Sequence, residues 1–168
     1  MRTDAERSKP SNWKRVLGIS VPRPGGWRWL RDAHSLAAML AAVPVWLVLG
    51  LVAGGRMQMV VTPTALISFV AVQPLLEELV FRGVLQGRLL ERGWTRRIGL
   101  VSTANLAATA AFVGLHLLTQ PPAWAIAVAV PSLVFGHMRD RFASVVPSIA
   151  LHSIYNAGFA VTAWIARS

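Results

Sequence analysis

Six polar residues interrupt otherwise apolar stretches, and their types suit hydrolysis: Glu77, Glu78, Arg82, His116, His152 and Asn156. Ionisable groups within membrane-spanning segments are energetically unfavourable, which makes them functional candidates. A glutamate can take a proton from water, an imidazole can accept or donate a proton, and a carboxamide can donate to a developing oxyanion. Together these residues suggest a hydrolytic site inside a bilayer.

The spacing of the first three residues predicts different roles for the two glutamates. Glu78 and Arg82 are four residues apart, so they share one helix face, with the acid nearer the N-terminus, the better order for an ion pair. Glu77 points about 100° away around the helix and has no obvious local partner. A carboxylate without a fixed counter-charge suits a general base. Alternatively, all three residues form a buried ion network that only holds helices together.

The other three residues lie on later stretches. His116 follows Phe112 by one turn on the same helix face, and His152 and Asn156 are also four residues apart. The last two side chains could donate to a common oxygen, although interhelical hydrogen bonding is an alternative for each of them.

The depths of Glu77 and His116 are compatible with a shared cavity. Glu77 lies 18 residues before the turn around Thr95, and His116 lies 21 residues after it. At 1.5 Å per residue, these positions differ in depth by only about 4–5 Å. Glu77 also lies about 28 Å along the helix from Arg96, which predicts a site toward the outer leaflet.

The composition is that of a membrane protein. Hydrophobic residues make up 54% and charged residues 14% of the 168 residues, and the mean hydropathy is +0.50. The net charge of +10 is compatible with nucleic-acid binding. However, a basic tail before long apolar runs is more typical of a cytoplasmic flank, so we expect no nucleic-acid partner. The absence of Cys excludes disulfides and a cysteine nucleophile.

The apolar runs predict an all-α, polytopic transmembrane bundle of about five helices, since a bilayer leaves no water to satisfy other backbone structures. The runs are approximately residues 35–54, a stretch from 59 through the glutamates, 98–118, 123–135 and 143–165. Residues 1–32 form a basic interfacial segment, and residues 33–168 form the transmembrane domain. Trp13, Trp27 and Trp29 are expected at the headgroups.

The distribution of Lys and Arg predicts an orientation with the N-terminus inside and the C-terminus outside. Fourteen of these residues then lie on the inner side, against Arg56 and Arg167 on the outer side. His34 and His137 are expected at membrane boundaries. Asp140 is expected to pair with a neighbouring Arg in a charged turn, residues 137–141.

The polar residues fall in three motifs, E-E-x-x-x-R at residues 77–82, F-x-x-x-H at 112–116 and H-x-x-x-N at 152–156. Their order resembles that of the CPBP family, the type II CAAX prenyl endopeptidases and their bacterial relatives. The resemblance covers residues 66–159. It implies that Glu77 activates water with help from His116, that His152 and Asn156 stabilise the oxyanion, and that Glu78 and Arg82 orient the helix.

The resemblance implies a glutamate-type intramembrane endopeptidase in a bacterial inner membrane. We expect a metal-free mechanism, because His116 and His152 lie on different helices and lack the spacing of a chelating pair. The alternative metal-dependent mechanism would use Glu77, His116 and His152 as zinc ligands. The short chain and the outward site favour a branch similar to myxosortases, which would cleave membrane-anchored proteins near a C-terminal anchor. Two other readings are a non-catalytic relative, such as a bacteriocin self-immunity factor or assembly partner, and a small transporter with Glu77 in a proton relay.

Overall fold

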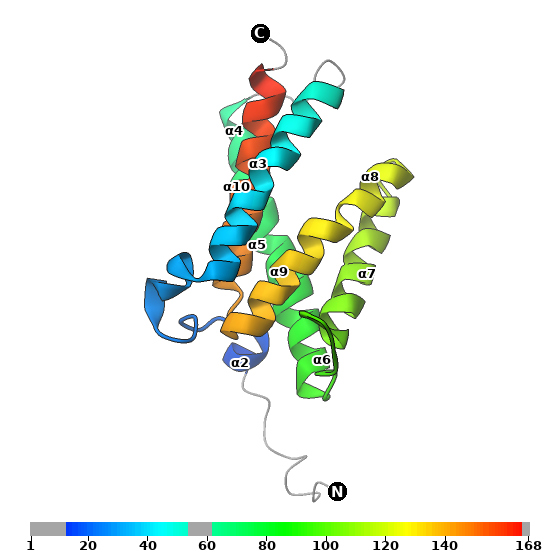
Figure 1. Ribbon diagram of the computed structural model, residues 1–168. Coiled ribbons are helices and arrows are strands. Elements are labelled where there is room, and N and C mark those ends of the chain that lie inside the picture. Colours follow the sequence, from blue (N-terminus) through cyan, green and yellow to red (C-terminus); the bar gives the residue numbers. More distant parts are fainter. Residues whose placement is uncertain (1–12, 54–61, 166–168) are drawn as a thin grey trace, which may run out of the picture.

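The computed structural model describes residues 13–53 and 62–165, which are mostly helical (Figure 1). The N-terminal part comprises α2 (Trp13–Leu17), the 3-10 helix η1 (Gly26–Arg31) and α3 (Ala33–Ala53). A continuous helix follows, divided into α4 (Pro63–Ile67), η3 (Ser68–Val72), α5 (Gln73–Glu78), η4 (Leu79–Gln86) and α6 (Gly87–Glu91). After the strands β1 (Arg97–Ile98) and β2 (Val101–Ser102) come α7 (Thr103–Leu117), α8 (Pro122–Ala127), α9 (Ala129–Phe142) and α10 (Val146–Ile165).

The continuous helix Pro63–Glu91 has 29 residues and is the one described helix that is long and apolar enough to cross a membrane. Shorter apolar helices cover Ala33–Val48 and Thr103–Leu117. The predicted helical, apolar character is therefore confirmed, whereas the number of crossings and the orientation stay predictions. The orientation also depends on Arg2, Arg7, Lys9, Arg56 and Arg167, which lie outside the described residues.

Helix α9 occupies the centre of the packing. It contacts α7 on one side and α10 on another, and α10 also packs along α3 (Figure 1). A buried core joins η1, α3, α9 and α10 through the side chains of Trp29, Ala38, Phe135, Met138, Phe142 and Leu151. Elsewhere large apolar side chains are exposed, including Leu40, Val130 and Trp164 at 60–70%. Such a surface suits contact with lipid.

The charged stretch at residues 137–141 is helical, so the prediction of a turn there is wrong. It belongs to α9, and the chain turns at Ala143, where φ is 50°. The helix can continue because its polar side chains have partners. His137 is 8% exposed and contacts His34, with 3.0 Å between ring nitrogens. Asp140 accepts a hydrogen bond from Gln86 at 2.8 Å, rather than pairing with an Arg.

Two further expectations need correction. The third apolar run begins with an antiparallel hairpin, and its helix starts only at Thr103, where the Ser102 hydroxyl accepts a hydrogen bond from the Asn105 N–H. A side chain that caps the first turn in this way fixes the start of a helix. Trp29 is 4% exposed and belongs to the core, whereas Trp13 and Trp27 are exposed as an interfacial position requires.

Candidate active site

The candidate site lies at the centre of the continuous helix. Glu77 is fourteen residues from both Pro63 and Glu91, about 21 Å along an α-helix in either direction. The helix ends five residues before Arg96, so the predicted helical distance of about 28 Å does not apply. Glu77 therefore lies at the middle of this helix, and the placement of the site toward the outer leaflet stays a prediction.

Three buried polar side chains lie along one face of this helix at a spacing of four residues. Glu78, Arg82 and Gln86 are each 0% exposed. Residues 79–86 form a π-helix, whose i to i+5 hydrogen bonds widen the turn and help residues four apart to share a face. Sequence analysis identified the first two residues and missed Gln86, which donates to the Gly136 carbonyl at 2.9 Å. Its position four residues after Arg82, on the same helix face, could have indicated that Gln86 is a buried polar residue.

Arg82 connects these buried side chains to α9. Its Nε lies 3.2 Å from Glu78 Oε2, so the predicted ion pair is confirmed. Its Nη2 donates to the Ser132 carbonyl at 2.9 Å and to the Ser132 hydroxyl at 2.7 Å. The guanidinium carbon is 5.0 Å from the centre of the Phe112 ring and 5.7 Å from that of Phe135. These aromatic faces stabilise the cation where water is excluded.

Ser132 continues the polar chain to α7. Its hydroxyl donates to Thr109 Oγ1 at 2.9 Å, and the Thr109 hydroxyl donates to Asn105 Oδ1 at 3.2 Å. The Asn105 amide then returns to α9 by donating to the Leu133 carbonyl at 2.9 Å. Sequence analysis missed this network, although Asn105 and Thr109 are polar residues four apart in an apolar run. The network holds α7, α9 and the glutamate helix in register.

His152 bridges the two glutamates. Its Nδ1 is 2.9 Å from Glu78 Oε1, and its Nε2 is 3.7 Å from Glu77 Oε2. A carboxylate only accepts hydrogen bonds, so Nδ1 donates to Glu78. The imidazole is stacked on Phe135, with ring centres 4.8 Å apart and an angle of 21°. Glu77 thus has a partner after all, but that partner comes from α10 rather than from the local sequence.

The two glutamate side chains differ in access. Glu78 is 0% exposed and contacts both Arg82 and His152, whereas the Glu77 side chain is 29% exposed. Adjacent residues of the same type therefore occupy one closed and one accessible setting. This contrast agrees with the different roles that their spacing predicts.

His116 lies on the same side of the site. Its Nδ1 is 2.9 Å from the Phe112 carbonyl oxygen, which can only accept, so this nitrogen carries the proton. In the neutral ring, Nε2 then presents a lone pair. Both His116 and His152 are close enough to Glu77 to interact with its charge. The Phe112 ring lies 4.3 Å from the His116 ring and 6.3 Å from the His152 ring.

Asn156 contacts the helix Pro63–Glu91 at a point nearer its N-terminus than Glu77. Its Nδ2 donates to the Phe69 carbonyl at 2.9 Å, within the π-helical segment η3. It is half-buried and lies one turn beyond His152 on α10. The structure thus brings Glu77, Glu78, Arg82 and His152 together directly, while one amide hydrogen of Asn156 is engaged in joining two helices. Among the described residues, no three His, Asp or Glu side chains are grouped so that they could hold a metal ion.

The fold and the site define a class of protein in which apolar helices enclose a buried cluster of carboxylates and imidazoles. A family model described as type II CAAX prenyl endopeptidase, Rce1-like, matches residues 41–158, most of the chain and all of the site residues. The chain belongs to this family of CAAX-type intramembrane proteases. The resemblance of the three motifs is thereby confirmed. Comparisons with curated proteins and with solved structures find no match.

Proposed function

We propose that this protein is an intramembrane endopeptidase that uses Glu77 as a general base to hydrolyse a peptide bond of a membrane-anchored protein. The observation that carries the proposal is the contrast between the two glutamates. Glu78 is enclosed by Arg82 and His152, whereas Glu77 remains accessible beside His152. A base must reach the water that it deprotonates, and only Glu77 offers that access.

A nucleophilic water fits beside Glu77 and His152, on the accessible side of both groups. Their 3.7 Å separation exceeds a direct hydrogen bond, and a water beside both groups would lie about 2.8 Å from each. Glu77 takes one proton from this water, and the His116 Nε2 lone pair accepts a hydrogen bond from it. The resulting hydroxide attacks the scissile carbonyl, and the proton on Glu77 passes to the leaving amine.

The oxyanion that forms needs hydrogen-bond donors. His152 donates from Nε2 when this nitrogen is also protonated, and its Nδ1–H stays with Glu78 at 2.9 Å. Asn156 has a second amide hydrogen besides the one that it gives to Phe69. Donors fixed in a site that excludes water stabilise developing charge more strongly than donors in solvent. Glu78 and Arg82 position the helix and the imidazole.

The proposed substrate is a protein with a membrane anchor, cleaved near the C-terminal anchor. The proposed orientation keeps the N-terminus inside, because the basic residues gather at one end of the bundle. Reporter fusions at the turn around Arg96 test this orientation, and an external reporter there would contradict it.

Co-expression with a membrane-anchored reporter tests the activity. The wild type should produce a new C-terminus, identified by mass spectrometry, and Glu77→Gln should not. A product that persists with Glu77→Gln would contradict the role of Glu77 as base. No product with either form, across a panel of anchored reporters, would favour the non-catalytic alternative. We also propose a metal-free mechanism, so activity should survive a chelator; loss that zinc reverses would contradict it.

A further inference from the structure

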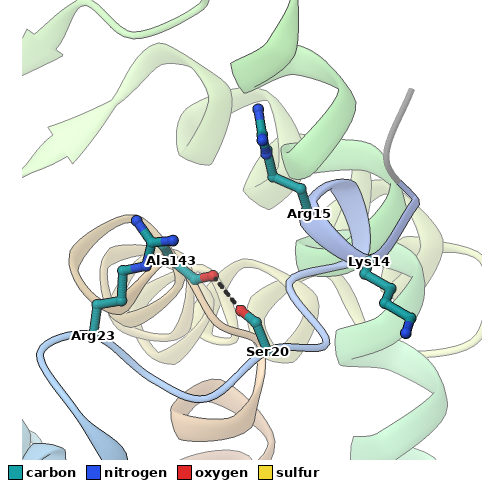
Figure 2. A pocket seen from close by; sticks show the side chains of 5 residues that line it. All are labelled: Lys14, Arg15, Ser20, Arg23 and Ala143. Carbon is teal, nitrogen blue, oxygen red and sulfur yellow. Dashed lines mark hydrogen bonds between the residues drawn. The ribbon is translucent and has the colours of Figure 1, made fainter. Parts of the chain in front are cut away.

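A second polar feature lies on the N-terminal segment, apart from the glutamate site. A pocket of about 280 Å³ is lined by Lys14, Arg15, Ser20, Arg23 and Ala143 (Figure 2). Three of these five residues carry a positive charge, and the pocket lies where the N-terminal segment meets the corner between α9 and α10. The proposed peptidase mechanism uses none of them.

Hydrogen bonds fix the wall of this pocket to the helix bundle. The Arg23 N–H donates to the Phe142 carbonyl at 3.0 Å, and the Ser144 hydroxyl donates to the Ser20 carbonyl at 2.7 Å. The Ser20 hydroxyl lies 3.3 Å from the carbonyl oxygen of Ala143 (Figure 2). Charged residues on a free tail would form no defined site, whereas these residues are held in place by their backbone.

Arg139 anchors α2, which carries Lys14 and Arg15 and forms another wall of the pocket. Arg139 is 4% exposed, and its Nη2 donates to the carbonyls of Arg15 and Val16 at 3.2 and 2.9 Å. The same guanidinium donates through Nε to the Arg82 carbonyl at 3.3 Å. A buried cation therefore satisfies the carbonyl end of α2. The exposed side chains of Lys14 and Arg15 remain available to a ligand.

The pocket presents positive charge without acidic partners. Within residues 13–53 and 62–165, no carboxylate forms an ion pair with Lys14, Arg15 or Arg23. Their side chains are exposed, and those of Lys14 and Arg15 extend away from each other in Figure 2. All three side chains are long and flexible enough to turn toward a phosphate in the pocket. Two guanidinium groups and an ammonium are donors suited to phosphate oxygens.

The surroundings favour a lipid as the source of the phosphate. Trp13, Val21 and Trp27 flank the basic residues and are 55%, 68% and 75% exposed. Indole rings beside cations are typical of a segment at the headgroup level of a membrane. Helix α2 also packs against α6, which carries Arg88 and leads into the turn around Thr95 (Figure 1).

We propose that this pocket binds the phosphate of an anionic glycerophospholipid at the membrane surface, with Lys14, Arg15 and Arg23 as the ligating cations. The phosphate enters the pocket while the exposed indoles lie beside the glycerol and upper acyl chains. Cations near an anionic membrane surface each strengthen attraction by about fivefold. The headgroup then fixes the depth of the N-terminal segment.

Native mass spectrometry of the full chain in detergent tests this site. Titration with phosphatidylglycerol or phosphatidylcholine gives an apparent Kd for each lipid, and we expect tighter binding of the anionic lipid. Replacing Lys14, Arg15 and Arg23 together by Gln should weaken phosphatidylglycerol binding by about tenfold or more, with no change for phosphatidylcholine. The matched control replaces three exposed arginines around Thr95 by Gln: Arg92, Arg96 and Arg97.

The outcomes separate the possible ligands. A selective loss in the pocket variant, with the control unchanged and gel-filtration profiles alike, supports the proposal. An equal loss in both variants overturns it, because general charge would then explain the binding. If excess inorganic phosphate displaces phosphatidylglycerol, the lipid assignment is wrong and the pocket binds free phosphate. Equal affinity of the wild type for both lipids also overturns the proposal.

Discussion

The ion pair between Arg82 and Glu78 gives the most specific stability prediction. The helix Pro63–Glu91 contains a second ion pair, Arg88 with Glu91, and both pairs have the same 3.2 Å separation. The first pair is 0% exposed on both side chains, and the second is 32% exposed on both. Burial is the largest difference between the two pairs. They also differ in spacing, four residues against three, and the Arg88 guanidinium carbon lies 4.0 Å from the centre of the Trp13 ring.

Arg82→Met should lower the free energy of unfolding by about 3–5 kcal/mol, because Glu78 would be left buried without its counter-charge. The two hydrogen bonds to Ser132 would be lost as well. Arg88→Met should change it by less than about 1 kcal/mol, since solvent screens an exposed pair. The double variant Glu78→Gln with Arg82→Met should be less destabilised than the sum of the two single variants, because the unpaired charge is gone.

Unfolding in mixed micelles of mild detergent and dodecyl sulfate, followed by circular dichroism, measures these differences. Equal losses of unfolding free energy for Arg82→Met and Arg88→Met would contradict the role of burial. A strictly additive double variant would show that the loss does not come from an uncompensated charge.

Three other predictions concern packing and pH. Gly136→Ala should destabilise the bundle by about 1–3 kcal/mol in the same unfolding assay, because the new methyl would overlap the Asn105 amide; an unchanged midpoint would contradict this contact. Gly87→Ala should release α2 from the bundle, because the new methyl would overlap the Val16 carbonyl, and proteolysis after Arg15 should increase. Gly114→Ala is the control and should not change proteolysis, because a methyl there meets no neighbouring atom. The pKa of Asp32 is lowered from 3.8, chiefly by hydrogen bonds from Arg141. The ionised Asp32 should thus stabilise the folded protein above pH 3.8, and this contribution to the free energy of unfolding should be lost as the pH falls below that value. Asp32→Asn should remove this pH-dependent contribution from acid unfolding.

Local spacing predicted the parts of the site that depend on a single helix. Glu78 and Arg82 are paired because positions four apart face each other, a relation that needs no knowledge of the fold. The same logic placed Phe112 beside His116, and their rings are 4.3 Å apart. The helical, apolar character followed from the lack of charge over long runs.

Contacts between helices were beyond local spacing. Nothing near Glu77 in the sequence indicates that His152 approaches it, because that distance depends on how α10 packs against α5. The charge of residues 137–141 indicated a turn between two apolar runs, although the stretch is part of α9. His137 and Asp140 both have partners on other elements, which allows a helix to continue through polar sequence.

The central claim is that Glu77 performs chemistry while Glu78 holds the structure. The most direct measurement compares cleavage and unfolding stability in Glu77→Gln and Glu78→Gln, in the same membrane mimetic and with the same anchored substrate. We expect Glu77→Gln to fold with near wild-type stability and to lose about 10²–10⁴-fold in cleavage rate. We expect Glu78→Gln to lose stability as well. Cleavage at the wild-type rate by a folded Glu77→Gln protein would contradict the account.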